Sequence, residues 1–206
     1  MTLHRAMAAV MAALLPLAAG AQVSWLENPE IQRRLAAGEV VVRSTLDPSQ
    51  PRGRVSAAVR INAIPEAIWS VMTDCEQAVT FVPGLKRCRR VRSAPDGAWD
   101  LIEHEVKYSW LLPTIRYVFR ATYQRPLRID FRRVSGDLKD EQGTWLLEPV
   151  PDGSATIVQY EVYLDPGFWV PQALVRHSLR DDLPALLEGL RERVEKVEPA
   201  HRSLAR

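Results

Sequence analysis

The segment Glu103-His104-Glu105 is the place in this sequence best suited to acid–base chemistry. Alternate residues of a strand point to opposite faces, so Glu103 and Glu105 share a face that His104 cannot join. If both glutamates face inward, each raises the pKa of the other, and one becomes a general acid or base. If they face solvent, they pair with cations on neighbouring strands, and His104 turns inward as a structural histidine. The candidate cations are Arg116, Arg120 and Arg128. We favour the solvent-facing arrangement.

Other catalytic or metal-binding patterns are missing from the sequence. The four histidines are His4, His104, His177 and His201, and none has a second ligand at metal-binding spacing. There is no G-x-S-x-G nucleophile motif, no glycine-rich phosphate loop and no C-x-x-C pair. We therefore assign no catalytic residue, no metal site and no cofactor. Lys plus Arg number 27 against 25 for Asp plus Glu, a balance that gives no reason to expect a nucleic-acid partner.

The first 21 residues have the pattern of a secretory signal peptide. His4 and Arg5 precede an apolar run from residue 6 to 18, and Ala19-Gly20-Ala21 supplies small residues for cleavage after Ala21. We therefore expect a secreted protein, which is periplasmic if the host is Gram-negative. An oxidising compartment permits a disulfide between Cys75 and Cys88, the only cysteines, worth about 3 kcal/mol. Two buried thiols are the alternative.

Aromatic residues are concentrated on strand faces that are too apolar to be solvated. They line a ligand pocket or simply pack in the core, and the sequence leaves both readings open. The candidate pocket residues are Trp69, His104, Tyr117, Phe119, Phe131, Trp145 and Tyr160, with Leu179, Leu183 and Leu186 from the last helix. Two apolar loops, 110–113 and 168–171, carry Trp110, Leu111 and Trp169. These either form a pocket mouth that touches a membrane or fold over the cavity.

The order of predicted elements indicates one α+β domain over residues 53–198, after an N-terminal extension (22–52) and before a short tail (199–206). Period-two apolar patterns and turn signals predict strands at 55–61, 86–93, 98–108, 114–125, 127–135, 141–149 and 155–165. A helix is expected after Asn28 in the extension, and a pair at 65–81. The last helix, to Val197, carries a leucine stripe, with Pro184 dividing it and Asp181 or Asp182 as the cap of its second half. A seven-stranded antiparallel sheet with one apolar face needs this helix as its cover.

Four stretches resemble the START-like (SRPBCC) superfamily, and most closely its polyketide cyclase/lipid-transport and coenzyme Q-binding START branch. They are 57–69 with its Pro-Glu-x-x-Trp helix start, 73–85 with Phe-Val-Pro-Gly-Leu, 143–149 with Gly-Thr-Trp-Leu-Leu-Glu-Pro, and 155–171. The resemblance implies a helix-grip fold, in which a curved seven-stranded antiparallel sheet wraps around a long C-terminal helix and leaves an internal cavity. Members bind lipids, sterols, quinones or polyketides, and a minority are enzymes; no catalytic motif transfers.

Three functions follow as hypotheses. The first is an exported carrier of a hydrophobic small molecule such as a lipid, quinone or sterol-like compound. The second is a cyclase or hydrolase that uses His104 with Glu103 or Glu105. The third is a protein-interaction module anchored by Trp110 and Trp169. We favour the carrier. The sequence names neither the ligand nor the oligomeric state.

Overall fold

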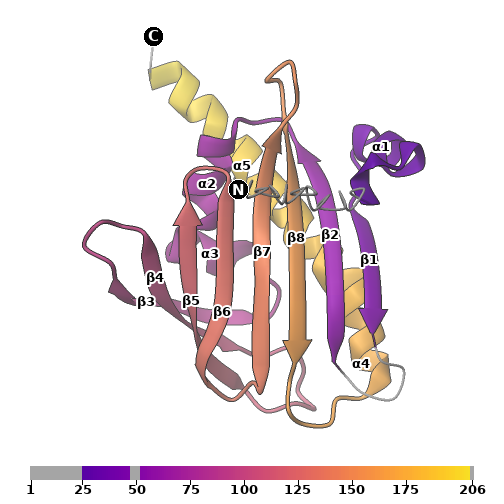
Figure 1. Cartoon of the computed structure of the whole chain (residues 1–206), viewed down its shortest axis with the longest axis vertical. Coiled ribbons are helices and arrows are strands. Elements are labelled where there is room, and N and C mark those ends of the chain that lie inside the picture. Colours follow the sequence, from indigo (N-terminus) through magenta and orange to yellow (C-terminus); the bar gives the residue numbers. More distant parts are fainter. Residues whose placement is uncertain (1–24, 47–51, 205–206) are drawn as a thin grey trace, which may run out of the picture.

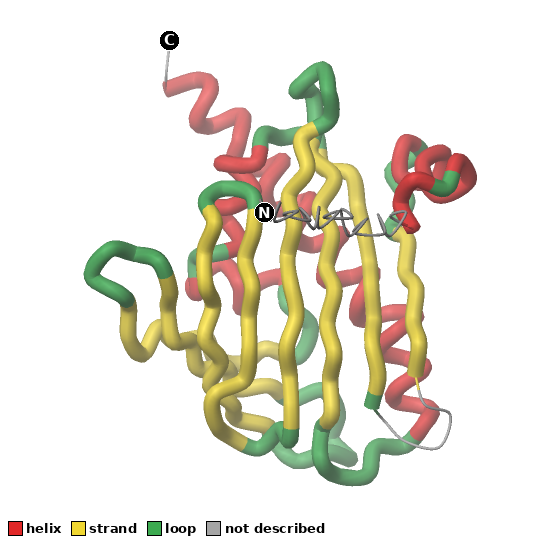
Figure 2. The backbone as a smooth tube through the Cα atoms, in the orientation of Figure 1, coloured by secondary structure: helices red, strands yellow, loops and turns green. Residues whose placement is uncertain are grey.

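An eight-stranded antiparallel sheet forms the protein, with the helix pair and the C-terminal helices packed on one face and the short N-terminal helix packed on the other face at the first two strands (Figures 1 and 2). The computed structural model describes residues 25–46 and 52–204. The strands are β1 (Val41–Leu46), β2 (Gly53–Ile61), β3 (Leu85–Ser93), β4 (Trp99–Val106), β5 (Ile115–Gln124), β6 (Arg128–Gly136), β7 (Asp140–Pro149) and β8 (Thr156–Asp165). Their order is β1-β2-β8-β7-β6-β5-β4-β3, and the β3–β4 end curls away from the plane of the central strands. The helix-grip fold predicted from the sequence is confirmed.

The count of seven strands was wrong by one, because the N-terminal extension contributes β1 to the sheet. β1 pairs with β2 from Val41↔Ala58 to Leu46↔Gly53. Without it, β2 would leave its backbone groups open at the edge of the sheet. Val41 and Leu35 of the extension are buried against Ala58, so the segment also adds a small apolar cluster. The extension is therefore part of the folded unit.

Two of the helices begin at a residue whose side chain caps the helix. A short 3-10 turn, η1 (Trp25–Glu27), precedes α1 (Pro29–Ala36), where the side chain of Asn28 accepts a hydrogen bond from the Glu30 amide at 2.8 Å. After α2 (Pro65–Met72), Asp74 caps α3 (Cys75–Phe81) by accepting from the Glu76 amide at 2.8 Å. Such caps satisfy backbone donors that have no partner within the helix.

A long helical run at the C-terminal end of the chain crosses the sheet. It is divided near Pro184, as predicted, but neither Asp181 nor Asp182 caps its second half. It consists of α4 (Gln172–His177), a π-helical turn η2 (Ser178–Asp182) and α5 (Leu183–Leu204), with Pro184 as the second residue of α5. The carboxylates proposed as caps bond to side chains instead: Asp181 to His177 at 2.7 Å and Asp182 to Ser178 at 2.8 Å. The helix backbone also continues beyond residue 198 into the predicted tail.

The core lies under the second half of this run. Leu187, Leu190 and Val194 of α5 are buried against Val59 of β2 and Val158 of β8. This contact fixes one half of the helix tightly on the sheet. The first half, with α4 and η2, faces the other ends of β2, β5, β7 and β8 across a cavity. The space between helix and sheet therefore opens towards one end of the molecule.

A disulfide between Cys75 and Cys88 joins the start of α3 to the edge strand β3. It links residues 13 apart in sequence and holds the helix pair against the curled end of the sheet. The predicted signal peptide, 1–21, lies outside the described residues. Among the helices of the described part, none has the length and apolar character needed to cross a membrane.

Candidate functional site

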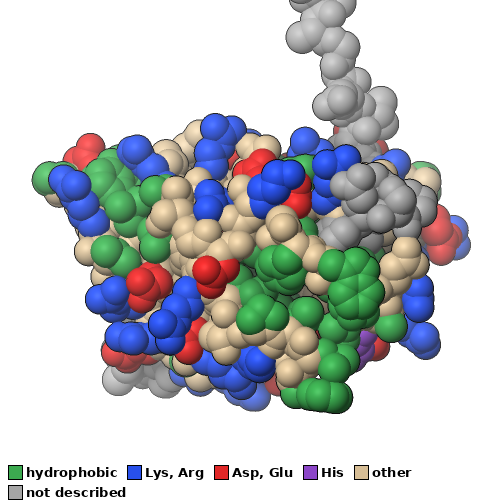
Figure 3. Space-filling view, turned by 90° about the horizontal axis from the view of Figure 1, so that it is seen from below, with side chains coloured by type: hydrophobic (Ala, Val, Ile, Leu, Met, Phe, Trp, Pro, Cys, Tyr) green, Lys and Arg blue, Asp and Glu red, His purple; other side chains and the backbone are tan. Residues whose placement is uncertain are grey.

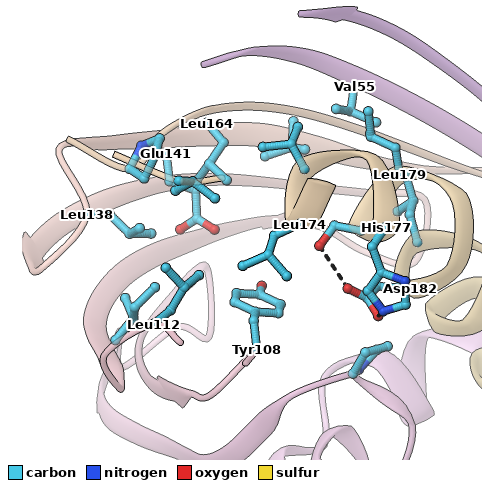
Figure 4. A pocket seen from close by; sticks show the side chains of 18 of the residues that line it. Val55, Tyr108, Leu112, Leu138, Glu141, Leu164, Leu174, His177, Leu179 and Asp182 are labelled. Carbon is cyan, nitrogen blue, oxygen red and sulfur yellow. Dashed lines mark hydrogen bonds and ion pairs between the residues drawn. The ribbon is translucent and has the colours of Figure 1, made fainter. Parts of the chain in front are cut away.

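A cavity of about 250 Å³ lies between the sheet and the first half of the terminal helical run. Its walls come from β2, β5, β7 and β8 on one side and from α4, η2 and the start of α5 on the other, with connecting loops closing the end (Figure 4). The wall is mainly apolar. Its principal apolar residues are Val55, Leu112, Ile115, Leu138, Val162, Leu164, Phe168, Val170, Leu174, Leu179, Leu183 and Leu186. Burial of an apolar molecule here is favourable at about 25 cal/mol per Å².

The structure divides the predicted pocket residues into two groups. Tyr117, Tyr160, Leu179, Leu183 and Leu186 lie on the cavity wall. The others do not line the cavity: they are Trp69, His104, Phe119, Phe131 and Trp145, all packed in the core or against one another.

Aromatic packing explains why these residues are withdrawn from the cavity. Trp145 and Tyr160 have ring centroids 4.2 Å apart, and Phe131 stacks on Tyr160 at 6.0 Å. Gly143 allows this arrangement, because a Cβ there would lie 2.5 Å from the ring of Phe131. The three rings thus pack together on the inner face of the sheet, and of the three only Tyr160 lines the cavity.

Glu141 is a site residue that the sequence analysis missed. It lies on β7, only 9% exposed, and its carboxyl group points into the cavity (Figure 4). One of its oxygens, Oε2, has no hydrogen-bond partner among the described residues. Burial raises the pKa of Glu141 to about 8; Asp140 adds to this, whereas Tyr117 and Arg133 oppose it. At neutral pH the carboxyl is therefore largely protonated.

Three tyrosine hydroxyls accompany Glu141. Tyr117 and Tyr160 lie beside it on the wall, and burial raises the pKa of both phenols well above the usual range. Tyr108 is 51% exposed, yet its hydroxyl points into the cavity (Figure 4), and burial of that end raises its pKa to about 12. Glu141 and the three tyrosines thus form a polar group on the cavity wall whose side chains are neutral at physiological pH.

Glu103 and Glu105 face away from the cavity, as predicted. Glu103 pairs with Arg89 at 3.2 Å and Glu105 with Arg116 at 3.0 Å. The other two proposed cations are engaged elsewhere: Arg120 lies over the ring of Trp99 and Arg128 pairs with Asp130. The inner face belongs to His104, whose Nδ1 lies 3.4 Å from the hydroxyl of Tyr117. Burial lowers the pKa of His104 to about 4, which keeps its imidazole neutral.

His177, Ser178 and Asp182 form a second polar patch, on the helical wall. The carboxylate of Asp182 lies in the middle, 2.8 Å from Ser178 Oγ and 3.6 Å from His177 Nε2. A hydrolytic triad instead needs the imidazole between the serine and the acid, so that it can take the hydroxyl proton. This arrangement does not activate Ser178. In the described part of the chain, no group of three or more His, Cys, Asp or Glu residues is arranged to hold a metal ion.

The end of the molecule where the cavity opens carries exposed apolar side chains. Trp110 is 85% exposed and Trp169 is 77% exposed, and Tyr108 and Leu111 are also exposed. Seen from below, apolar side chains gather on part of this face (Figure 3). The loops that carry them also supply Leu112, Phe168 and Val170 to the cavity wall. Each loop thus has one side in the cavity and one side in solvent.

A protein-family model described as polyketide cyclase/dehydrase and lipid transport matches residues 61–191. The chain belongs to this family. The matched range holds the helix pair, β3 to β8, most of the terminal helical run and Glu141. The family resemblance seen in the sequence is confirmed, although the finer relation to the coenzyme Q-binding branch is not part of the match.

Solved structures show the same fold at low sequence identity. A STAR-related lipid transfer protein from Xanthomonas axonopodis is 16% identical with a TM-score of 0.63, covering 76% of this chain and 93% of that one. A START superfamily protein from Mycobacterium smegmatis is 21% identical with a TM-score of 0.59, covering 70% and 98%. The Zhui aromatase/cyclase from Streptomyces is 13% identical with a TM-score of 0.58, covering 70% and 94%. These likenesses show the fold alone. No curated protein matches the sequence.

Proposed function

We propose that this protein is an exported carrier or buffer of a hydrophobic small molecule. The observation that carries the proposal is the apolar cavity between the sheet and α4, η2 and α5. The family description includes lipid transport, and the similar protein from Xanthomonas is named as a lipid transfer protein. The cavity volume of about 250 Å³ suits a single-chain or ring-sized molecule, such as a quinone head group or a sterol-like body, better than a whole phospholipid.

A carrier must also release its ligand, and we propose that the ligand leaves through the open end of the cavity into a membrane. Trp110, Leu111 and Trp169 insert into the interfacial region of a bilayer, where Trp side chains are favoured, and the cavity then faces the lipid. The signal-peptide pattern of residues 1–21 supports export. The start of the mature protein, sequenced after purification from a secreted or periplasmic fraction, is expected at Gln22. A chain that retains Met1 in the cytoplasm would contradict export.

A variant that fills the cavity tests the carrier function directly. Leu179→Trp places a large ring in the space, whereas Glu188→Trp places the same ring on the exposed side of α5. The neutral fluorophore N-phenyl-1-naphthylamine is expected to bind the wild type and Glu188→Trp, and to bind Leu179→Trp much more weakly. Equal uptake by all three proteins, or no uptake by the wild type, would contradict the proposal.

An enzyme of the cyclase type is a second candidate, favoured by one observation. A carboxyl group with a raised pKa in an apolar cavity is a common form of general acid, and Glu141 has that environment. Such an enzyme would use Glu141 in place of Glu103 and Glu105, which are held on the outer face. Native mass spectrometry separates the two functions. A carrier releases its bound molecule unchanged, and an enzyme converts it over time.

A further inference from the structure

The buried polar atoms that lack partners in the described structure are few, and one of them faces the cavity. They are Oε2 of Glu141 and Nε of Arg133. A buried polar atom without a partner is destabilising, and an atom left in this state in a native protein calls for an explanation such as a bound group. Because Glu141 lies on the cavity wall with its carboxyl turned inward, a ligand can reach it (Figure 4).

The surroundings of Glu141 restrict what that ligand group is. The hydroxyl of Tyr108 points into the same space, and Tyr117 and Tyr160 lie on the wall nearby. All of these groups are neutral hydrogen-bonding groups, because burial disfavours their charged forms. An anionic ligand would meet the carboxylate of Asp182 on the facing helical wall. An ammonium group would lose its hydration in a mainly apolar cavity, at a much higher cost than a hydroxyl.

We propose that Glu141 is the recognition residue for a hydroxyl group on an otherwise apolar ligand, with Tyr108 as its partner at the same spot. This inference rests on the proposed function and adds the ligand class. A hydroxyl group both donates and accepts, so it can donate to Oε2 of Glu141 and accept from the phenol of Tyr108. The apolar remainder of the molecule lies against Leu174, Val162 and Leu186.

Three probes with one chain length separate the candidate head groups. They are 1-decanol, decanoate and decylamine, each used to displace N-phenyl-1-naphthylamine at pH 7. The proteins are the wild type, Glu141→Leu, Glu141→Gln, Tyr108→Phe and the control Glu148→Leu. The control makes the same change on the exposed face of the same strand. Glu141→Gln keeps a neutral hydrogen-bonding group at the site.

We expect the wild type to bind decanol at least about tenfold more tightly than the other two probes, because a charged head group loses its hydration in the mainly apolar cavity. Glu141→Leu should bind decanol about tenfold more weakly than the wild type, because it loses one buried hydrogen bond worth about 1.4 kcal/mol. Tyr108→Phe should lose part of the decanol affinity, and Glu141→Gln and Glu148→Leu should retain it. A preference for decylamine, or full decanol binding by Glu141→Leu, would overturn the inference while leaving the carrier function intact. If the wild type takes up no fluorophore at all, the proposed function fails, and the ligand assignment fails with it.

Discussion

The hydroxyl of Tyr117 on β5 lies 3.4 Å from Nδ1 of His104 on the adjacent strand β4. Tyr117 and Glu141 both line the cavity. Burial shifts the two titrating groups of this region in opposite directions. The pKa of His104 falls from 6.5 to about 4, and that of Glu141 rises from 4.5 to about 8. Both groups are therefore neutral in the folded protein between pH 4.5 and 6.5, and their effects on stability have opposite signs.

The first prediction concerns His104. Its folded pKa lies below its unfolded pKa, so the unfolded chain binds more protons between pH 4 and 6.5, and stability is lost as the pH falls through that range. Glu141→Gln removes the opposing contribution. In that variant, the free energy of unfolding in urea should fall towards acid by at most about 1.4 kcal/mol per pH unit. His104→Phe in the same background should remove the slope; a slope that persists would contradict the assignment.

The second prediction concerns Glu141. Its folded pKa lies above its unfolded pKa, so the folded state retains a proton between pH 4.5 and 8, and stability falls as the pH rises through that window. His104 no longer contributes above pH 6.5. Urea unfolding of the wild type from pH 6.5 to 8 should therefore show a decline of at most about 1.4 kcal/mol per pH unit. Glu141→Gln should be flat over this range, and a parallel decline in both proteins would assign the effect to another group.

Strand periodicity, turn residues and the leucine stripe predicted an antiparallel sheet covered by the last helix, and the family resemblance implied the helix-grip fold, but the sequence predicted the cavity wall only in part. Alternation places Tyr117, Phe119, Phe131 and Trp145 correctly on the inner face. Whether an inner residue reaches the cavity depends on how rings pack, and Phe131 and Trp145 stack on Tyr160 instead of lining it.

Glu141 lines the cavity although the sequence analysis did not predict it. It lies two steps of alternation from Trp145, so the pattern puts it on the inner face. Its charge at the start of a strand favours a solvent-facing reading, since acids are rarely buried without a partner. Alternation, applied without regard to residue type, would have identified it.

The third prediction concerns the exposed end of the cavity. Trp110→Ser and Trp169→Ser should each weaken co-sedimentation with phospholipid vesicles by about tenfold, because a large apolar side chain gains about 1.5–3 kcal/mol on leaving water. Unfolding stability should stay within about 0.5 kcal/mol, as for other surface substitutions. Val91→Ser is the control, since Val91 is exposed on β3, outside the cavity-closing loops. Equal loss in all three variants would mean that vesicle binding does not involve these loops.

The fourth prediction concerns the link between α3 and β3. Replacing both Cys75 and Cys88 with Ser should lower the free energy of unfolding by about 3 kcal/mol, because the disulfide closes a short loop and restricts the unfolded chain. Tyr117 and Glu141 lie on β5 and β7, outside the two elements that the disulfide joins. The double variant should therefore still take up N-phenyl-1-naphthylamine under native conditions. Reduction of the wild type with dithiothreitol should reproduce the loss of stability, and an unchanged urea midpoint after reduction would mean that the bridge contributes nothing to the fold.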